Sequence, residues 1–357
     1  MRLLEIEAGG HACQALVGPL EQARERLRAL SRGRPLTAVT DETIWALHGE
    51  RLSQVHAVEP LFVPAGEAAK SWANLEALLR SLAGRGLTRS TPVLAFGGGS
   101  VGDLTGLAAG LFKRGCPVVH IPTTFLAQVD SAIGGKTAID FAGQKNVVGL
   151  FHQPAFVIAD PSLLATLDGR QMRAGYAELV KYGLIADPPV YDFAEREAAG
   201  ILSGDLALRC RAVDTAIRCK ADYVARDPED RTGVRALLNF GHTFGHAVEA
   251  LTGFGPILHG EAVALGMALA FGLSAELGHC PGDDANRVIA DLRSVGLPTT
   301  LQEAGVTGRG AELAALMAAD KKADSLGPKL ILTRGIGKAF IANVTVAELA
   351  AFLDRAA

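Results

Sequence analysis

Three histidines fall within one short stretch, NFGHTFGHAVEALTGFGPILHGEAV, at residues 239–263. His242 and His246 are four residues apart, so a helix would project both from one face. His259 follows the turn TGFGPIL and begins the next predicted helix. An i, i+4 pair of histidines suits shared metal binding, although the glutamate of an HExxH zinc motif is absent. Spacing alone leaves open which two of the three histidines would bind an ion.

A carboxylate upstream could complete such a site. Glu178 lies in RAGYAELVKYG, where its neighbours are mostly small or apolar. A buried, unpaired charge is costly, so this carboxylate needs a partner, and Lys181 one turn further on is one candidate. A catalytic zinc ion is the other, since it is held by three protein ligands that often include a carboxylate. Three histidines close together and one glutamate favour the metal.

A glycine-rich loop follows a predicted strand in the first half of the chain. After TPVLAF comes GGGSVGDLTGLAAGLF, in which Gly97, Gly99 and Gly102 fit the pattern G-x-G-x-x-G and a helix is predicted to open at the end. Glycines at such a turn let the backbone approach a pyrophosphate, whose charge is stabilised by free N–H groups at the start of a helix. The loop therefore predicts a dinucleotide site.

Other contacts to that nucleotide must come from earlier in the chain. No acid lies at the usual offset of about 20 residues beyond the loop, so Asp41, at the end of the strand PLTAVTD, is the candidate for a ribose carboxylate. GEAAK places Glu67 and Lys70 at another strand–helix junction. For this pair alone, a solvated helix N-terminus is the favoured interpretation.

Cations recur within a run that is otherwise apolar and rich in glycine, residues 113–146. They are Lys113, Arg114, Lys136 and Lys145. A single lysine is usually a solvent-exposed surface charge. Several cations among apolar residues and glycines are less easily explained in that way. A concave site for a phosphorylated or carboxylated substrate would use them, with Asp130 and Asn146 contacting its hydroxyl groups.

The order of predicted elements divides the chain near residue 160. Before it, short β-rich runs (35–40, 58–63, 91–96, 117–122 and 155–160) alternate with helical patterns (20–31, 70–84 and 102–113). Alternation of this kind predicts an α/β domain with a parallel sheet and helices on both faces. After it, the pattern is almost wholly helical apart from a strand candidate at 328–333. We therefore expect a nucleotide-binding α/β domain at residues 1–160 and a mainly α-helical metal- and substrate-binding domain at residues 161–357.

Composition narrows the class of protein. The formal net charge of the 357 residues is −3, so nothing global points to nucleic acid or an anionic membrane as a partner. The five cysteines include no CxxC pair, as expected for reduced thiols. The N-terminus lacks the apolar core of a signal peptide, and the longest apolar stretch, residues 262–275, is too short to span a bilayer. We expect a soluble, cytoplasmic protein.

Taken together, the motifs resemble those of the 3-dehydroquinate synthase family within the sugar-phosphate cyclases. The resemblance covers roughly residues 40–335, and the joint occurrence of the motifs is highly specific. In order they are GEAAK, GGGSVGDLTG, KRG, IPTTFLAQVDSAIGGKT, QKNVVGLFHQP, RAGYAELVKYG, LLNFGHTFGHAVE and LHGEAVALGM. The resemblance implies a homodimeric, NAD- and metal-dependent lyase of the shikimate pathway, acting on a seven-carbon keto sugar acid phosphate.

The resemblance also implies a set of site residues. Glu178, His242 and His259 would bind a divalent ion, zinc or cobalt, with His246 beside them for substrate binding or proton transfer. NAD contacts would fall on Asp41, Glu67, Lys70, Gly98, Gly99, Asp103, Thr123, Thr124 and Lys145. Substrate contacts would fall on Asp130, Lys136, Asn146, Lys181, Lys220, Arg235, Asn239 and one of Lys321 and Lys322, with Arg114 helping to hold the phosphate.

Three alternatives remain. The loop GGGS, with Ser100 after the glycines, also resembles metal-dependent alcohol and glycerol dehydrogenases, which transfer a hydride to or from small uncharged substrates. The lysine-rich run and the AELVKYG motif argue against them. A sister cyclase that makes another carbocycle is a nearer rival, against which Lys181 and the motif FHQP favour the dehydroquinate type. A catalytically inactive binding protein is the third, and nothing in the sequence supports it.

Overall fold

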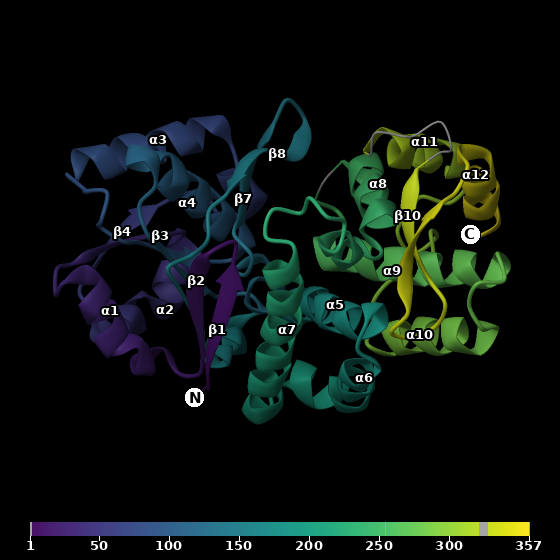
Figure 1. Ribbon diagram of the computed structural model, residues 1–357, viewed down its shortest axis with the longest axis horizontal. Helices are drawn as coiled ribbons and strands as arrows, with labels where there is room; N and C mark the ends of the chain where they lie inside the picture. The colour runs from purple at the N-terminus through teal and green to yellow at the C-terminus, as the bar shows by residue number, and fades with distance from the viewer. Residues whose placement is uncertain (1, 254, 321–327, 357) are drawn as a thin grey trace. The chain divides into compact units, whose positions relative to one another are not determined.

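The computed structural model describes residues 2–253, 255–320 and 328–356 (Figure 1). The chain divides into two compact units. The first is Met1–Asp168 with Gly204–Arg231, and the second is Gly169–Ser203 with Thr232–Ala357. Among the described residues, no helix is both long enough and apolar enough to cross a membrane.

The first unit is built on a seven-stranded sheet in the order β1-β2-β9-β6-β5-β3-β4. Its strands are β1 (Arg2–Ala8), β2 (His11–Val17), β3 (Leu36–Thr40), β4 (Val58–Phe62), β5 (Val93–Gly97), β6 (Val118–Pro122) and β9 (Phe156–Ala159). β1 and β2 form an antiparallel hairpin at one edge, and every other pairing is parallel. The predicted parallel sheet and its five strands are therefore confirmed, whereas the sequence analysis missed the first two strands.

Helices cover both faces of this sheet (Figure 1). They are α1 (Arg24–Ser31), α2 (Glu42–Val55), α3 (Trp72–Gly84) and α4 (Gly99–Leu111). Successive residues of a strand point to opposite faces, and accordingly Leu94 of β5 packs in the core beneath α1 and α2, while Val93 packs in the core beneath α3 and α4. Burial on both faces explains why β3, β5, β6 and β9 are mostly apolar, without the alternation of a half-exposed strand. Helix α4 begins at Gly99, three residues earlier than predicted.

The hairpin of β7 (Lys136–Phe141) and β8 (Gln144–Phe151) also belongs to the first unit and was not predicted. The sequence also did not predict where α7 (Leu206–Arg226) lies: this helix packs against β1. Arg2 of β1 donates a hydrogen bond to Asp214 of α7 at 2.6 Å. The two compact units therefore divide the chain differently from the expected boundary at 160/161, since α7 falls in the first unit. Periodicity identifies an amphipathic helix without identifying the surface on which it packs.

The second unit is mainly helical, as the sequence predicts. Its helices are α5 (Gly169–Ile185), α6 (Pro188–Ser203), α8 (His242–Thr252), α9 (His259–Glu276), α10 (Gly282–Ser294), α11 (Gly310–Asp320) and α12 (Val346–Arg355). The predicted late strand is β10 (Lys329–Thr333), which pairs with an unpredicted β11 (Ala339–Asn343). Helix α9 is buried along most of its length and packs against α5, α8, α10 and β10. A helix that is apolar all round is expected at the centre of such a unit.

Candidate metal and nucleotide sites

The close packing of α9 against α5 positions the candidate metal ligands. A Cβ atom on Gly260 would lie only 2.0 Å from the carbonyl oxygen of Ala174, so no side chain fits there. His259 precedes this glycine at the start of α9, and Glu178 lies one turn beyond Ala174 on the same face of α5. The contact between the two helices therefore sets the separation of these two side chains.

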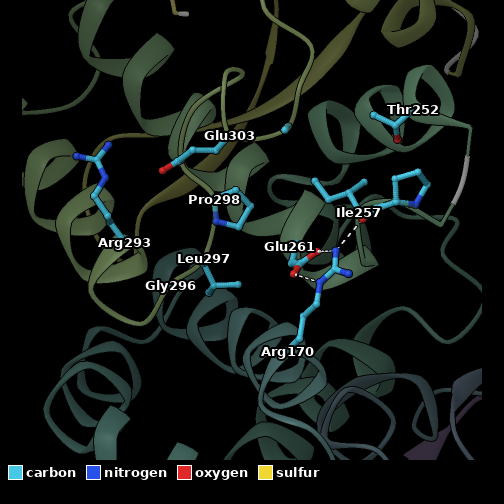
Figure 2. Close-up of a pocket in the computed structure, with 11 residues that line it drawn as sticks. Arg170, Thr252, Ile257, Glu261, Arg293, Gly296, Leu297, Pro298 and Glu303 are labelled. Atoms are coloured by element: carbon cyan, nitrogen blue, oxygen red, sulfur yellow. Dashed lines mark hydrogen bonds and ion pairs between the residues drawn. The ribbon is translucent and has the colours of Figure 1, made fainter.

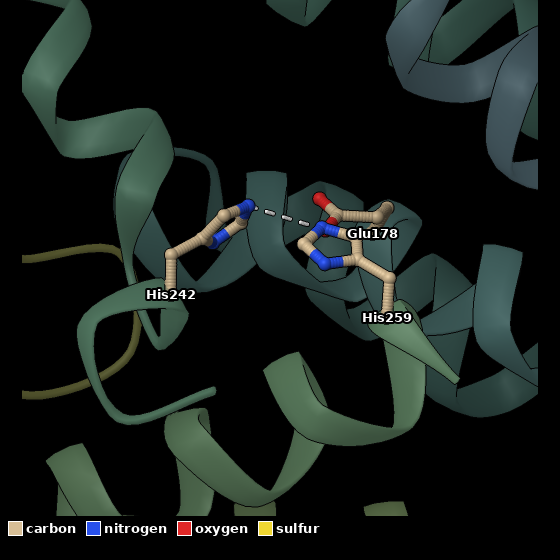
Figure 3. A group of neighbouring side chains, drawn as sticks. All are labelled: Glu178, His242 and His259. Carbon is tan, nitrogen blue, oxygen red and sulfur yellow. Dashed lines mark ion pairs between the residues drawn. The ribbon is translucent and has the colours of Figure 1, made fainter. Parts of the chain in front are cut away.

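Glu178, His242 and His259, hereafter the metal cluster, converge (Figure 3). Oε1 of Glu178 lies 3.6 Å from Nε2 of His242 and 3.7 Å from Nε2 of His259. With metal–ligand bonds of about 2.0–2.2 Å, ligand atoms around a tetrahedral zinc ion are roughly 3.4 Å apart. These two separations exceed this value only slightly, and all three ligand atoms lie within 4.8 Å of one another, so small side-chain movements would bring them onto one ion.

The environment of Glu178 also fits a cation. Its side chain is fully buried, and within the described residues neither carboxylate oxygen accepts a hydrogen bond of normal geometry. Lys181, which is 1% exposed, forms a short ion pair with Oε2. The two partners considered for Glu178 from the sequence are thus compatible: the lysine contacts one oxygen, and the histidines face the other. The donor set of one carboxylate and two imidazoles is one that zinc and cobalt accept.

Both histidines of the cluster have shifted pKa values. Burial, together with the charge of Lys181 and the neighbouring imidazoles, holds the pKa of His242 well below its usual value. That histidine is therefore neutral, the form that binds metals. Burial also lowers the pKa of His259, but a hydrogen bond with Glu249 and the charges of Glu249 and Glu178 outweigh it, so the net shift is upward.

His246 lies beside the metal cluster and not within it. Its ring centroid is 5.5 Å from that of His242 and 5.9 Å from that of His259. Its side chain is more accessible than that of His242, which is buried. The geometry thus selects His242 and His259 as the pair facing Glu178, which the spacing had left open. Glu249, to which the sequence analysis gave no role, lies on the other side of His259.

The nucleotide candidates gather at the carboxyl ends of the parallel strands. The chain passes from β3 to β4 in one direction along the sheet, and from β5 through β6 to β9 in the other. Ligands of such sheets bind at the switch point, outside the strand ends. Here that point lies between β3 and β5, which are followed directly by Asp41 and by Gly98 and Gly99. Thr123 and Thr124 follow the neighbouring β6.

The start of α4 has the features of an anion site. Gly98 is its N-cap and supplies no side chain to accept hydrogen bonds from the first turn, whose N–H groups lack partners within the helix. A Cβ atom at Gly98 would meet Thr124 Cγ2 at 3.1 Å. Asp41, in contrast, already caps α2, because its Oδ1 accepts a hydrogen bond from the Ile44 N–H at 2.9 Å. That structural role leaves its other oxygen for a ligand.

Five of the predicted residues form a second charged group, the Lys70 cluster. Its members are Glu67, Lys70, Asp103, Lys145 and Asn146. The Lys70 ammonium lies 2.9 Å from Asp103 and 3.6 Å from Glu67, and donates a short hydrogen bond to Asn146. Lys70 is only 4% exposed, so interpreting it as a solvated helix terminus is wrong. Burial raises the pKa of Asp103 to about 6, although Lys70 opposes the shift.

The other predicted substrate residues lie in both units. In the first unit, Lys220 of α7 contacts Asp130 at 2.8 Å, Lys136 contacts Asp230 at 2.6 Å, and Arg114 is exposed. In the second unit, the 3-10 helix η6 (Arg235–Asn239) carries a buried Arg235 at one end and a half-buried Asn239 at the other. Lys321 and Lys322 lie outside the described residues.

A cavity of about 370 Å³ in the second unit involves none of the residues predicted from the sequence (Figure 2). Arg170 and Glu261, on its wall, pair with each other at 2.6 Å. Glu303 accepts hydrogen bonds from the backbone of Thr299 and Thr300. These charges are occupied within the protein, so we assign the cavity no role.

Comparison with protein families supports the motif analysis. The family described as 3-dehydroquinate synthase N-terminal matches residues 60–174, and that described as 3-dehydroquinate synthase C-terminal matches residues 175–323. A 3-dehydroquinate synthase of Zymomonas mobilis is 46% identical over 98% of this chain and 94% of its own length. One of Caulobacter vibrioides is 45% identical over 99% of this chain and 98% of its own.

Solved structures of other cyclases are also similar. A 2-epi-5-epi-valiolone synthase from Streptomyces hygroscopicus with bound NAD+ and Zn2+ is 30% identical, with a TM-score of 0.88 over 99% of this chain and 98% of that one. A 2-deoxy-scyllo-inosose synthase complexed with carbaglucose-6-phosphate, NAD+ and Co2+ is 26% identical, with a TM-score of 0.87 over the whole of both chains. A probable glycerol dehydrogenase from Sinorhizobium meliloti, at 18% identity and a TM-score of 0.66 over 96% of each chain, shares the fold alone.

Proposed function

The chain belongs to the 3-dehydroquinate synthase family, and we propose that it performs the family's reaction with the metal cluster as its ion site. The substrate is 3-deoxy-D-arabino-heptulosonate 7-phosphate, and the products are 3-dehydroquinate and phosphate. One hydroxyl is oxidised, phosphate is eliminated, the ketone is reduced again, and an intramolecular aldol step closes the carbocycle. The observation that carries the assignment of residues is the convergence of His242 and His259 on the buried carboxylate of Glu178, which accepts no hydrogen bond of normal geometry from the part of the chain that the structure describes.

Each part of the metal cluster has a distinct task in this proposal. Glu178, His242 and His259 hold the divalent ion, zinc or cobalt. A bound ion supplies Lewis acidity toward hydroxyl and carbonyl oxygens of the substrate. Lys181, buried against Glu178, offsets part of the carboxylate's charge. The ammonium group of Lys181 would donate its other hydrogen bonds to the substrate. His246, beside the cluster and more accessible than His242, would exchange protons with a bound substrate.

The first unit provides the NAD site. Free N–H groups at the start of α4, next to Gly98 and Gly99, receive the pyrophosphate, and Asp41 receives a ribose hydroxyl. Thr123 and Thr124 line the adjacent strand end. The Lys70 cluster completes the set of polar contacts to NAD. NAD held at these residues would supply a temporary hydride acceptor that is regenerated within the same turnover.

Cations bind the acidic substrate in this scheme. Lys136, Lys220, Arg235 and Arg114 would contact its phosphate and carboxylate, and would stabilise the charge that develops on the leaving phosphate. Asp130, Asn146 and Asn239 would contact its hydroxyl groups. Lys220 and Lys136 already pair with carboxylates at 2.8 and 2.6 Å, so substrate binding must compete with those ion pairs.

One assay separates this activity from its rivals. The metal-loaded protein is incubated with catalytic NAD and the heptulosonate phosphate, while inorganic phosphate and the absorbance of NADH are followed together. We expect phosphate release over many turnovers without accumulation of NADH. Steady NADH production from a simple alcohol would instead identify a dehydrogenase. Failure to release phosphate from this substrate, with release from a hexose phosphate, would identify a sister cyclase.

The setting of the enzyme is a further part of the proposal. A cytoplasmic location is consistent with the five cysteines, none of which forms a disulfide in the structure. We propose a homodimer, for which the exposed Arg114 and the exposed apolar side chains Val147 and Phe151 of β8 provide candidate surface. Size-exclusion chromatography with light scattering would give the mass directly, and a value near 37 kDa would contradict the dimer.

A further inference from the structure

Glu249 has a contact that the proposed function does not use. It lies on α8 and is 2% exposed. Its Oε2 is 3.3 Å from Nδ1 of His259, within hydrogen-bonding distance. His259 therefore has a carboxylate on each side: Glu178 faces its Nε2 at 3.7 Å, and Glu249 faces its Nδ1.

Two interpretations of Glu249 are open. His246, Glu249 and His259 also bring potential ligand atoms close together and could form a second ion site. A neutral imidazole, however, carries one proton, on one of its two nitrogens. If Nε2 of His259 binds an ion with Glu178 and His242, the proton resides on Nδ1 and needs an acceptor. The two ion sites therefore exclude each other on a neutral ring.

Burial decides between them. The site with Glu178 combines a fully buried carboxylate with the buried His242, whereas the second would depend on the more accessible His246. The first can hold an ion away from competing water, so its ion takes Nε2 of His259. Glu249 then remains as the acceptor for the Nδ1 proton. His242 is held in a parallel way, because its Nδ1 lies 3.2 Å from the carbonyl oxygen of Phe240.

We propose that Glu249 is a positioning residue that accepts the Nδ1 proton of His259 and thereby fixes the tautomer and ring orientation in which Nε2 binds the metal. This inference rests on the proposed function, since it requires the ion to lie between Glu178, His242 and His259. A carboxylate behind a ligating imidazole makes the other nitrogen a better donor, and losing such a partner typically weakens metal binding by about 10–100-fold. Glu249 does not contact the reacting atoms.

The test is a competition titration of zinc and cobalt against a chromophoric chelator, on the full chain. Glu249→Leu removes the acceptor at similar volume, and we expect metal affinity about 10–100-fold below wild type. Glu249→Gln retains an oxygen acceptor without its charge, and a loss of about fivefold is expected, because charge-assisted hydrogen bonds are roughly twice as strong as neutral ones. The visible absorption of bound cobalt should change more in the leucine variant than in the glutamine variant.

Two controls make the result specific. Asp291→Asn removes another buried carboxylate of the second unit, on α10, and should leave metal affinity within about twofold of wild type. Glu178→Gln removes a proposed ligand and should lower affinity by more than the about 100-fold expected at most from loss of a supporting partner. Circular dichroism and thermal melts of each variant in excess chelator report whether the metal-free chain is folded.

The outcomes separate the inference from its premise. If Glu178→Gln loses the metal while Glu249→Leu binds it as wild type does, the positioning role is refuted and the ion site stands. If both variants bind as wild type does, the ion site itself is misplaced. Should Glu249→Leu fail to fold without metal, Glu249→Gln decides: a loss of about fivefold supports the role, and unchanged affinity overturns it.

Discussion

The metal cluster and the Lys70 cluster are both partly or wholly buried and charged, but they satisfy their charges in different ways. In the metal cluster, Glu178 has one cationic neighbour, Lys181, and its oxygens accept no hydrogen bond of normal geometry among the described residues. In the Lys70 cluster, by contrast, the cation already contacts Asp103, Glu67 and Asn146.

This difference indicates how each site meets its ligand. In the metal cluster, Oε1 of Glu178 and the Nε2 atoms of His242 and His259 face one another, an arrangement that suits a small cation, and helix packing sets their positions. The Lys70 cluster is closed on itself, so a nucleotide there must share or displace existing contacts, which lowers the net gain from binding. The metal cluster should therefore depend most on backbone packing, and the Lys70 cluster most on protonation.

The largest effect is expected from Gly260→Ala. A methyl group 2.0 Å from the carbonyl oxygen of Ala174 forces α9 away from α5, and we expect a loss of about 3 kcal/mol in unfolding free energy together with weakened metal binding. Gly282→Ala is the matched control, because nothing lies within 4 Å of its added Cβ. Both are measured by urea denaturation in chelator and by metal titration. Equal midpoints for the two variants would show that the helix contact does not fix the cluster.

A smaller effect, dependent on pH, is expected from Asp103→Asn. The pKa of Asp103 is raised from 3.8 to about 6 in the folded protein, so the folded state binds its proton more tightly than the unfolded state. The contribution of the protonated Asp103 to the unfolding free energy is therefore full below the pKa of the unfolded state, 3.8, and is lost as the pH rises through the folded-state pKa of about 6. Asparagine cannot ionise. Relative to wild type, the variant should therefore gain about 2 kcal/mol between pH 4 and 7.

Denaturation midpoints of wild type and Asp103→Asn, measured in parallel from pH 4 to 8, test this difference. Loss of the ion pair with Lys70 adds a constant offset near neutral pH, so only the slope bears on the prediction. Two parallel curves would mean that Asp103 titrates normally and that Lys70 compensates its burial fully.

Local patterns predicted the elements that are stabilised by near neighbours. The glycine loop is one example: the sequence TPVLAFGGGS contains an apolar run followed directly by glycines, and this order predicted a strand, β5, that ends where the turn into α4 begins. A metal site was predicted because three histidines lie close together in the sequence and a glutamate among apolar residues needs a partner. The family resemblance, and not the spacing, singled out His242 and His259. Nitrogen-to-carboxylate contacts such as His259 to Glu249 depend on ring orientation, which spacing does not encode.

Contacts between distant segments were the part that the sequence could not reveal. Lys70 looked like a solvated terminus, yet the β7–β8 hairpin covers it: the Asp140 N–H donates to the Lys70 carbonyl oxygen at 2.9 Å, and Asn146 contacts its ammonium. Likewise α7 carries an ordinary amphipathic pattern, and the unit to which it belongs is revealed by contacts such as its ion pairs with Arg2 and Asp130. The sequence identified these residues as candidates, but it could not predict their contacts, because the partners lie about 70 to 210 positions away along the chain.

The smallest effect is expected from Lys136→Met, which removes an ion pair of the same unit as the Lys70 cluster but at its surface. The side chain of Lys136 is 51% exposed and that of Asp230 is 23% exposed. Exposed pairs contribute little, because water screens them and two side chains must be ordered, so unfolding free energy should change by less than about 0.5 kcal/mol. Urea denaturation of wild type and variant at low and high salt measures this change in unfolding free energy. A loss above about 2 kcal/mol would mean that this pair, like that of Lys70, is part of the folded framework and not a contact held ready for substrate.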